Sequence, residues 1–184
     1  MSNIIYTTPD LRGHSALVRE ALGGWEVSAI ITAQSGYPFT VGAGFGNNQS
    51  GAAQYEDRAD VVPSAARNVR TGGKQNWIKN YFNINAFVEN APGTFGNSGK
   101  NIMQAPPLDY TDAGIFKNWT FRDRYGLQFR WEMFNALNQP SFSAPNAGNQ
   151  ISNTGINVGG SEGQITSTGA EPARIGQMAV KVTF

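Results

Sequence analysis

Residues 125–134 alternate between two kinds of side chain with a period of two, and this pattern constrains the fold more than any other feature of the chain. One set of alternate positions holds Tyr125, Leu127, Phe129, Trp131 and Met133, and the other holds Gly126, Gln128, Arg130, Glu132 and Phe134. A period of two is the signature of a β-strand, in which successive side chains point to opposite faces. Ten residues of strand span about 33 Å. We therefore predict a long strand with one face of large apolar side chains.

Three other segments carry the same period. Residues 25–34 place Trp25, Val27, Ala29, Ile31 and Ala33 on one face. Residues 110–117 alternate as well, and together with 125–134 they predict an antiparallel hairpin. Near the end of the chain, Met178, Val180, Val182 and Phe184 alternate with more polar residues. The chain is thus predicted to be all-β, with antiparallel strands.

The remaining residues carry little regular pattern. Residues 1–23 are mixed and polar, with one helical turn over 16–22, and we expect them to form a lead-in segment before the strands and loops of 24–184. The chain holds 22 glycines and 9 prolines among its 184 residues, many of them in the segments between the strands. Residues 55–108 are therefore expected to be mostly loop. Aromatic residues within this stretch either pin the loop or stack on sugars or peptides, and pinning is the commoner role. These aromatic residues are Trp77, Tyr81, Phe82 and Phe87.

The composition excludes several functions. Fourteen basic and 13 acidic residues are scattered along the chain, which argues against a nucleic-acid partner. There is no cysteine and only one histidine, His14, so a catalytic triad or a multi-histidine metal site cannot be built from one chain. Glu56, Asp57 and Asp60 could form a calcium loop, but turn-forming carboxylates are the favoured interpretation. We expect no enzyme activity, no catalytic residue, no metal and no cofactor.

Residues 1–10 show no secretory signal, and no apolar run reaches the roughly 18 residues that a transmembrane helix needs. Membrane strands escape this test because their apolar residues alternate with polar ones. The apolar face could be the core of a soluble sandwich or the lipid-facing wall of a barrel. Large side chains, Tyr125 at the end of the strand, and Arg130 and Glu132 on the opposite face suit the barrel wall. The candidate lipid-facing or assembly residues are Trp25, Val27, Ile31, Leu127, Phe129, Trp131 and Met133.

Several motifs, in order, resemble the closing part of TonB-dependent outer-membrane receptors of the Oar-like type, which carry a carboxypeptidase-regulatory-like domain. They are GGWEVS (23–28), QSGYPFTV (34–41), RADVVP (58–63), PGTFGNSG (92–99), FKN (116–118), LQFRWEMFN (127–135) and NQPSF (138–142). The last strand, which ends with Met178, Val180, Val182 and Phe184, resembles the C-terminal signal by which outer-membrane barrels are recognised for insertion.

This resemblance implies a wall segment of a receptor or transporter that binds or takes up a ligand at the bacterial outer membrane or cell surface. Such receptors have a plug, a TonB box and about 22 strands, the size class with a plugged lumen. Only the last few strands are present here, so the expected fold is a partial transmembrane-type β-barrel. The expected partners are the outer membrane or the rest of a barrel.

Two alternatives stay open. An incomplete barrel leaves two unpaired strand edges, which template pairing with other chains. The chain could therefore be a secreted, extracellular structural protein that self-associates edge to edge into an oligomer or filament. It could also be a soluble β-sandwich that binds glycans through its aromatic and Asn-rich loops.

Overall fold

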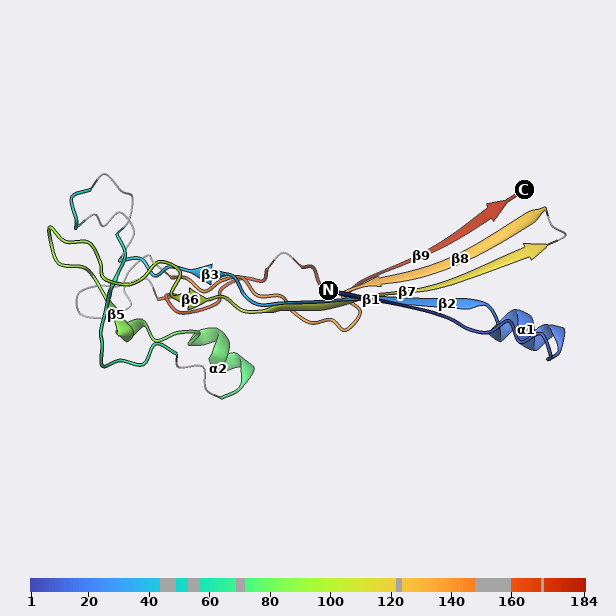
Figure 1. Cartoon of the computed structure of the whole chain (residues 1–184), viewed down its shortest axis with the longest axis horizontal. Coiled ribbons are helices and arrows are strands. Elements are labelled where there is room, and N and C mark those ends of the chain that lie inside the picture. Colours follow the sequence, from blue (N-terminus) through green and yellow to red (C-terminus); the bar gives the residue numbers. More distant parts are fainter. Residues whose placement is uncertain (44–48, 53–56, 69–71, 122–123, 148–159, 170) are drawn as a thin grey trace. The chain divides into compact units, whose positions relative to one another are not determined.

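The computed structural model describes residues 1–43, 49–52, 57–68, 72–121, 124–147, 160–169 and 171–184. Its main element is an antiparallel five-stranded sheet in the order β1-β2-β7-β8-β9, with the strands side by side (Figure 1). The strands are β1 (Ser2–Thr7), β2 (Trp25–Gln34), β7 (Leu108–Phe121), β8 (Tyr125–Phe134) and β9 (Ile175–Thr183). Helix α1 (Ala16–Leu22) lies between β1 and β2 in the chain. The all-β class predicted from the alternating segments is confirmed.

The four predicted strands and the hairpin are present, and the hairpin's first strand is longer than the sequence pattern indicated. β7 continues to Phe121 because its residues 118–121 still pair with β8. The expectation that residues 1–23 contain no strand is wrong, since β1 pairs with β2 from Ser2↔Ile31 to Thr7↔Glu26. Ile4 and Ile5 place apolar side chains on both faces of β1, which hides the period of two.

Contacts divide the chain into two compact units. The first, here called the strand unit, comprises Met1–Gln34, Leu108–Ser141 and Glu171–Phe184. The second, here called the loop unit, comprises Ser35–Pro107 and Phe142–Ala170. The elements of the loop unit are short: β3 (Pro38–Phe39), β4 (Asp60–Val61), α2 (Lys74–Lys79), η1 (Ile84–Ala86), β5 (Phe87–Val88) and β6 (Met103–Gln104).

The loop unit has a hydrophobic core of its own. Tyr81, Phe82 and Phe87 are buried, and the rings of Phe82 and Phe87 meet edge to face at 5.7 Å. The Tyr81 hydroxyl donates a hydrogen bond of 2.8 Å to the Gln104 carbonyl oxygen, which satisfies its polar end. Little of this unit is regular, as the sequence predicted, and its aromatic residues pin the loops. The sequence pattern did not reveal that these loops enclose a core.

One close backbone approach in this unit requires a glycine. A Cβ atom on Gly96 would lie 1.7 Å from the carbonyl oxygen of Arg58, so no side chain fits there. Within the described residues, no helix is long and apolar enough to cross a membrane.

Candidate functional site

The register of the five strands places the large apolar side chains on one face of the sheet, here called the apolar face. A single row crosses all five strands through the pairs Tyr6↔Val27, Val27↔Ile115, Ile115↔Trp131 and Trp131↔Met178. The next row joins Lys117 to Phe129 and Phe129 to Val180. Because paired residues of neighbouring strands share a face, these rows define one continuous surface.

The apolar face is exposed within the strand unit. Tyr6 is 59% exposed, Val180 is 66% exposed and Met178 is 73% exposed. Among the described strand residues, the face carries charge only at Asp109 and Lys117, each toward one end of β7. Contiguous exposed apolar surface of this kind marks a site of contact with lipid or with another protein.

The opposite face is polar, with hydrogen bonds between neighbouring strands. The Gln128 amide donates to Asn118 Oδ1 at 2.9 Å, and the Gln177 amide donates to Glu132 Oε2 at 2.8 Å. The Arg130 guanidinium lies over the Phe116 ring on this face, 5.2 Å from its centroid. Such a face suits a hydrated lumen.

Aromatic side chains gather at one end of the apolar face. The Trp25 ring meets both Trp119 and Phe129 edge to face, each at a centroid distance of 6.2 Å. The indole groups of the two tryptophans also bind α1. Trp25 Nε1 donates to the Ala21 carbonyl at 2.7 Å, and Trp119 Nε1 donates to the Glu20 carbonyl at 3.4 Å. The last carbonyls of a helix have no intrahelical donor, so these bonds cap α1 and fix it over the apolar face. Tryptophan residues at the edge of an apolar band form the interfacial girdle of membrane barrels.

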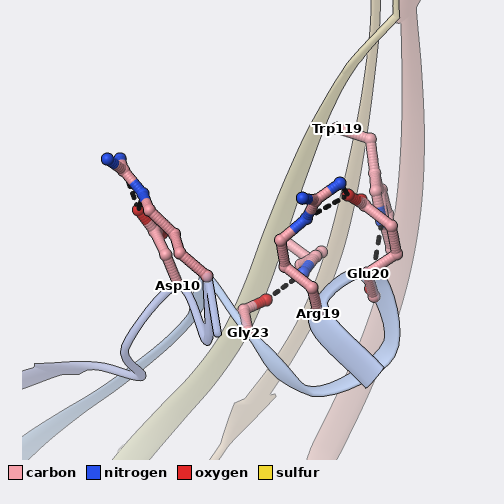
Figure 2. Close-up of polar contacts among 7 residues, drawn as sticks. Asp10, Arg19, Glu20, Gly23 and Trp119 are labelled. Carbon is pink, nitrogen blue, oxygen red and sulfur yellow. Dashed lines mark hydrogen bonds and ion pairs between the residues drawn. The ribbon is translucent and has the colours of Figure 1, made fainter. Parts of the chain in front are cut away.

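Lys117 lies inside this aromatic cluster and is only 4% exposed. Its ammonium group donates to the Gly23 carbonyl, just past the C-terminus of α1 (Figure 2). The same nitrogen lies 5.7 Å from the Trp25 ring centroid and 5.4 Å from that of Trp119. Aromatic faces and a helix C-terminus both attract a cation, so the charge is accommodated on an otherwise apolar surface.

The two ends of the sheet differ in their connections. At the end where Gln34 pairs with Leu108 and Phe134 pairs with Ile175, the chain leaves through residues 35–107 and 135–174. The opposite end holds the short connection between Phe121 and Tyr125, the segment of α1, and the C-terminus. In outer-membrane barrels the short turns are periplasmic and the long loops are extracellular.

The structure brings the predicted site residues together. All seven candidate lipid-facing residues lie on the apolar face: Trp25, Val27, Ile31, Leu127, Phe129, Trp131 and Met133. Met178, Val180 and Val182 of the C-terminal strand lie on the same face. Phe184 follows the end of β9 and is 92% exposed. Sequence reasoning missed Lys117 and Trp119. Continuing the alternation of β7 from Ile115 to residue 119 would have placed both on this face.

The carboxylates singled out in the sequence have backbone partners in the loop unit. Asp57, 3% exposed, accepts hydrogen bonds from Ser50 N and Ser50 Oγ, both at 2.7 Å, and from Asn90 Nδ2 at 3.1 Å. Burial raises the pKa of Asp57, but these hydrogen bonds outweigh burial and lower it below its ordinary value. Asp60 Oδ1 accepts from Asn97 N at 2.7 Å. Both side chains thus hold together segments that are distant in the sequence, whereas Glu56 lies outside the described residues. In the described part of the chain no group of three or more potential metal ligands is present.

An apolar face with an aromatic girdle at one end, a polar opposite face, and loops of unequal length at the two ends are the features of the wall of a membrane-spanning β-barrel. The family model described as outer membrane beta barrel domain matches residues 1–177, and the chain belongs to this family, which places it in the bacterial outer membrane. No curated protein and no solved structure matches the chain.

Proposed function

We propose that the chain is the C-terminal wall of a larger TonB-dependent receptor that binds or takes up a ligand, without enzymatic activity. In this proposal the apolar face contacts lipid, the polar face lines the lumen, and the loop unit is extracellular. The observation that carries the proposal is the apolar row across all five strands, from Tyr6 to Met178, opposite a face of hydrogen-bonded polar side chains.

The edges of the sheet support a larger barrel. In the described sheet, β1 and β9 each pair on one side only. A barrel wall needs a partner at each edge, and unpaired edges that stay exposed invite aggregation. Further strands of the same receptor would pair with both.

The orientation can be tested by cysteine labelling. Because the chain has no cysteine, each introduced cysteine is unique. We expect Lys100→Cys, which is exposed in the loop unit, to react with a membrane-impermeant maleimide in intact cells. We expect His14→Cys, which is exposed in the segment before α1, to react only after the outer membrane is permeabilised. The reverse pattern, or equal labelling of both, would contradict the orientation.

The receptor assignment is tested by the size of the native protein. An antibody against this chain should detect, in outer-membrane fractions, a protein well above the 19.8 kDa of the 184 residues. A heat-sensitive oligomer built from a 19.8 kDa protein would instead support the alternative in which copies pair edge to edge. That alternative is favoured by the same one-sided pairing of β1 and β9.

A further inference from the structure

A cleft of about 620 Å³ lies at the α1 end of the sheet. Its lining includes Asp10, Arg12, Arg19, Glu20, Gly23 and Lys117. α1 lines one side of the cleft. The end of β7, which continues past its pairing with Trp25 of β2, lines the other. Lys117 links the cleft to the aromatic end of the apolar face, because it lines the cleft and lies beside the rings of Trp25 and Trp119, whereas Asn118 and Thr120 of the same lining belong to the polar face.

The cleft carries three cations and two carboxylates. Arg12 pairs with Asp10 at 2.9 Å, and Arg19 pairs with Glu20 at 3.2 Å (Figure 2). The side chains of both pairs are 46% to 85% exposed. Exposed pairs of this kind contribute little free energy, so the two guanidinium groups can exchange their partners for another anion.

Lys117 differs from these two arginines because its charge is buried. Its ammonium group has three donors, and one of them reaches the Gly23 carbonyl. No carboxylate forms a salt bridge with it among the described residues. With three cations against two carboxylates, a site of this composition attracts an anion.

Next to the cleft, α1 presents apolar side chains outward. Leu17 is 84% exposed and Leu22 is 61% exposed. Because α1 is capped by Trp25 and Trp119 of the apolar face, it lies on the same side of the sheet as the proposed lipid surface. A short helix with exposed leucines and one arginine beside an aromatic girdle matches the chemistry of the membrane interface.

We propose that α1, Arg12, Arg19 and Lys117 form a binding site for the phosphodiester headgroup of a phospholipid in the periplasmic leaflet. The inference rests on the proposed lipid-facing role of the apolar face. The acyl chains lie along that face beside Phe129, and the leucines of α1 enter the leaflet. The phosphate replaces Asp10 and Glu20 as the partner of Arg12 and Arg19. Arginine suits this role because its planar donors match phosphate oxygens in pairs.

The site can be tested by titrating the purified full chain, in a nonionic detergent, with short-chain phosphatidylglycerol. The readout is the change in tryptophan fluorescence, to which Trp25 and Trp119 contribute because they border the site. We expect saturable binding that Arg19→Gln weakens about tenfold, whereas Arg130→Gln, the matched loss of one charge on the polar face, leaves it unchanged. Lys117→Gln keeps a donor for the Gly23 carbonyl and should weaken binding at least as much as Arg19→Gln. Circular dichroism verifies that each variant is folded.

Two further ligands separate the sources of the signal. Diacylglycerol with the same chains lacks the phosphate and should not bind saturably, and inorganic phosphate should bind far more weakly than the lipid. Equal affinity of the Arg19→Gln and Arg130→Gln variants, or equal affinity for phosphate and lipid, would overturn the proposal. If cysteine labelling confirms the membrane orientation while the titration fails, only the headgroup site is wrong. If both fail, the membrane role of this face is wrong as well.

Discussion

The substitution Val180→Arg separates a lipid-facing surface from a water-exposed one. Val180 lies on the apolar face of β9 and is 66% exposed, so an arginine there displaces little packing within the chain. In water, a surface substitution at such a position changes the free energy of unfolding by no more than about 0.5 kcal/mol. In a bilayer, an arginine on the lipid face costs about 2–4 kcal/mol at the midplane and about 0–1 kcal/mol near the interfaces.

The position of Val180 along the strand sets the expected magnitude. β9 has nine residues, and its length of about 30 Å corresponds to about 23 Å of height at a tilt of about 40°. This height is close to the apolar band of about 25 Å in membrane barrels. Val180 is the sixth of the nine residues and pairs with Phe129 in the middle of β8. It therefore lies near the midplane, and we expect the full 2–4 kcal/mol.

The measurement is urea unfolding of the native outer-membrane protein that carries this chain, reconstituted in phosphatidylcholine vesicles and followed by tryptophan fluorescence. The matched control is Gln177→Arg on the opposite face of the same strand, where the arginine retains a donor for Glu132. A second variant, Tyr125→Arg at the aromatic end of the face, should cost less than Val180→Arg. Equal effects of Val180→Arg and Gln177→Arg, or an effect of Val180→Arg within 0.5 kcal/mol of zero, would refute the assignment of this face to lipid.

Three other predictions concern both units. Phe129→Arg should lower the amount of protein in outer-membrane fractions, while Gln128→Arg on the polar face should leave it unchanged, and equal losses would contradict the face assignment. Asp57→Asn should speed amide hydrogen exchange in the loop unit at neutral pH, because it removes a charged acceptor from bonds worth about 1.5–3 kcal/mol each. Since the folded-state pKa of Asp57 is lowered, its stabilisation is complete above the unfolded value of about 3.9 and is lost as the pH falls below it. The protection of wild-type amides, relative to their intrinsic exchange rate at each pH, should therefore fall there, and the variant's should not. Phe87→Ala, at a fully buried position, should destabilise the loop unit by about 3–5 kcal/mol, measured by the same exchange experiment, and a cost below 1 kcal/mol would argue against the core described above.

Much of the strand unit is predictable from sequence. In β2 and β8 the period of two persists for ten residues, so local pattern alone identifies both strands and the residues that share a face. The glycines after Leu22 likewise mark the end of α1, where Gly24 adopts a φ of 65° that other residues rarely adopt. β1 was missed because apolar side chains lie on both of its faces, although a run of β-branched and aromatic residues before Pro9 signals a strand.

The loop unit was harder to predict because its core has no period. Val41, Tyr81 and Phe87 are fully buried, yet they are far apart in the sequence. Val41 and Tyr81 lie outside the helices and strands, and Phe87 lies in a strand of two residues. Only contacts between distant segments, such as the hydrogen bond from Tyr81 to Gln104, bring such residues together. No local pattern encodes contacts of this kind.

The sequence by itself determined the all-β class, the long strands and the apolar residues on each, because the alternation of side chains along a strand is a local property of the backbone. Only the tertiary structure decided that these separate apolar stripes form one face. The reason is that the register between strands depends on pairing between segments that are distant in the sequence, such as Tyr6 with Val27 and Trp131 with Met178. The same is true of Lys117. Besides Trp119, its partners are Trp25 and the Gly23 carbonyl, which lie about ninety positions away in the sequence, and together these groups stabilise a charge on an otherwise apolar face.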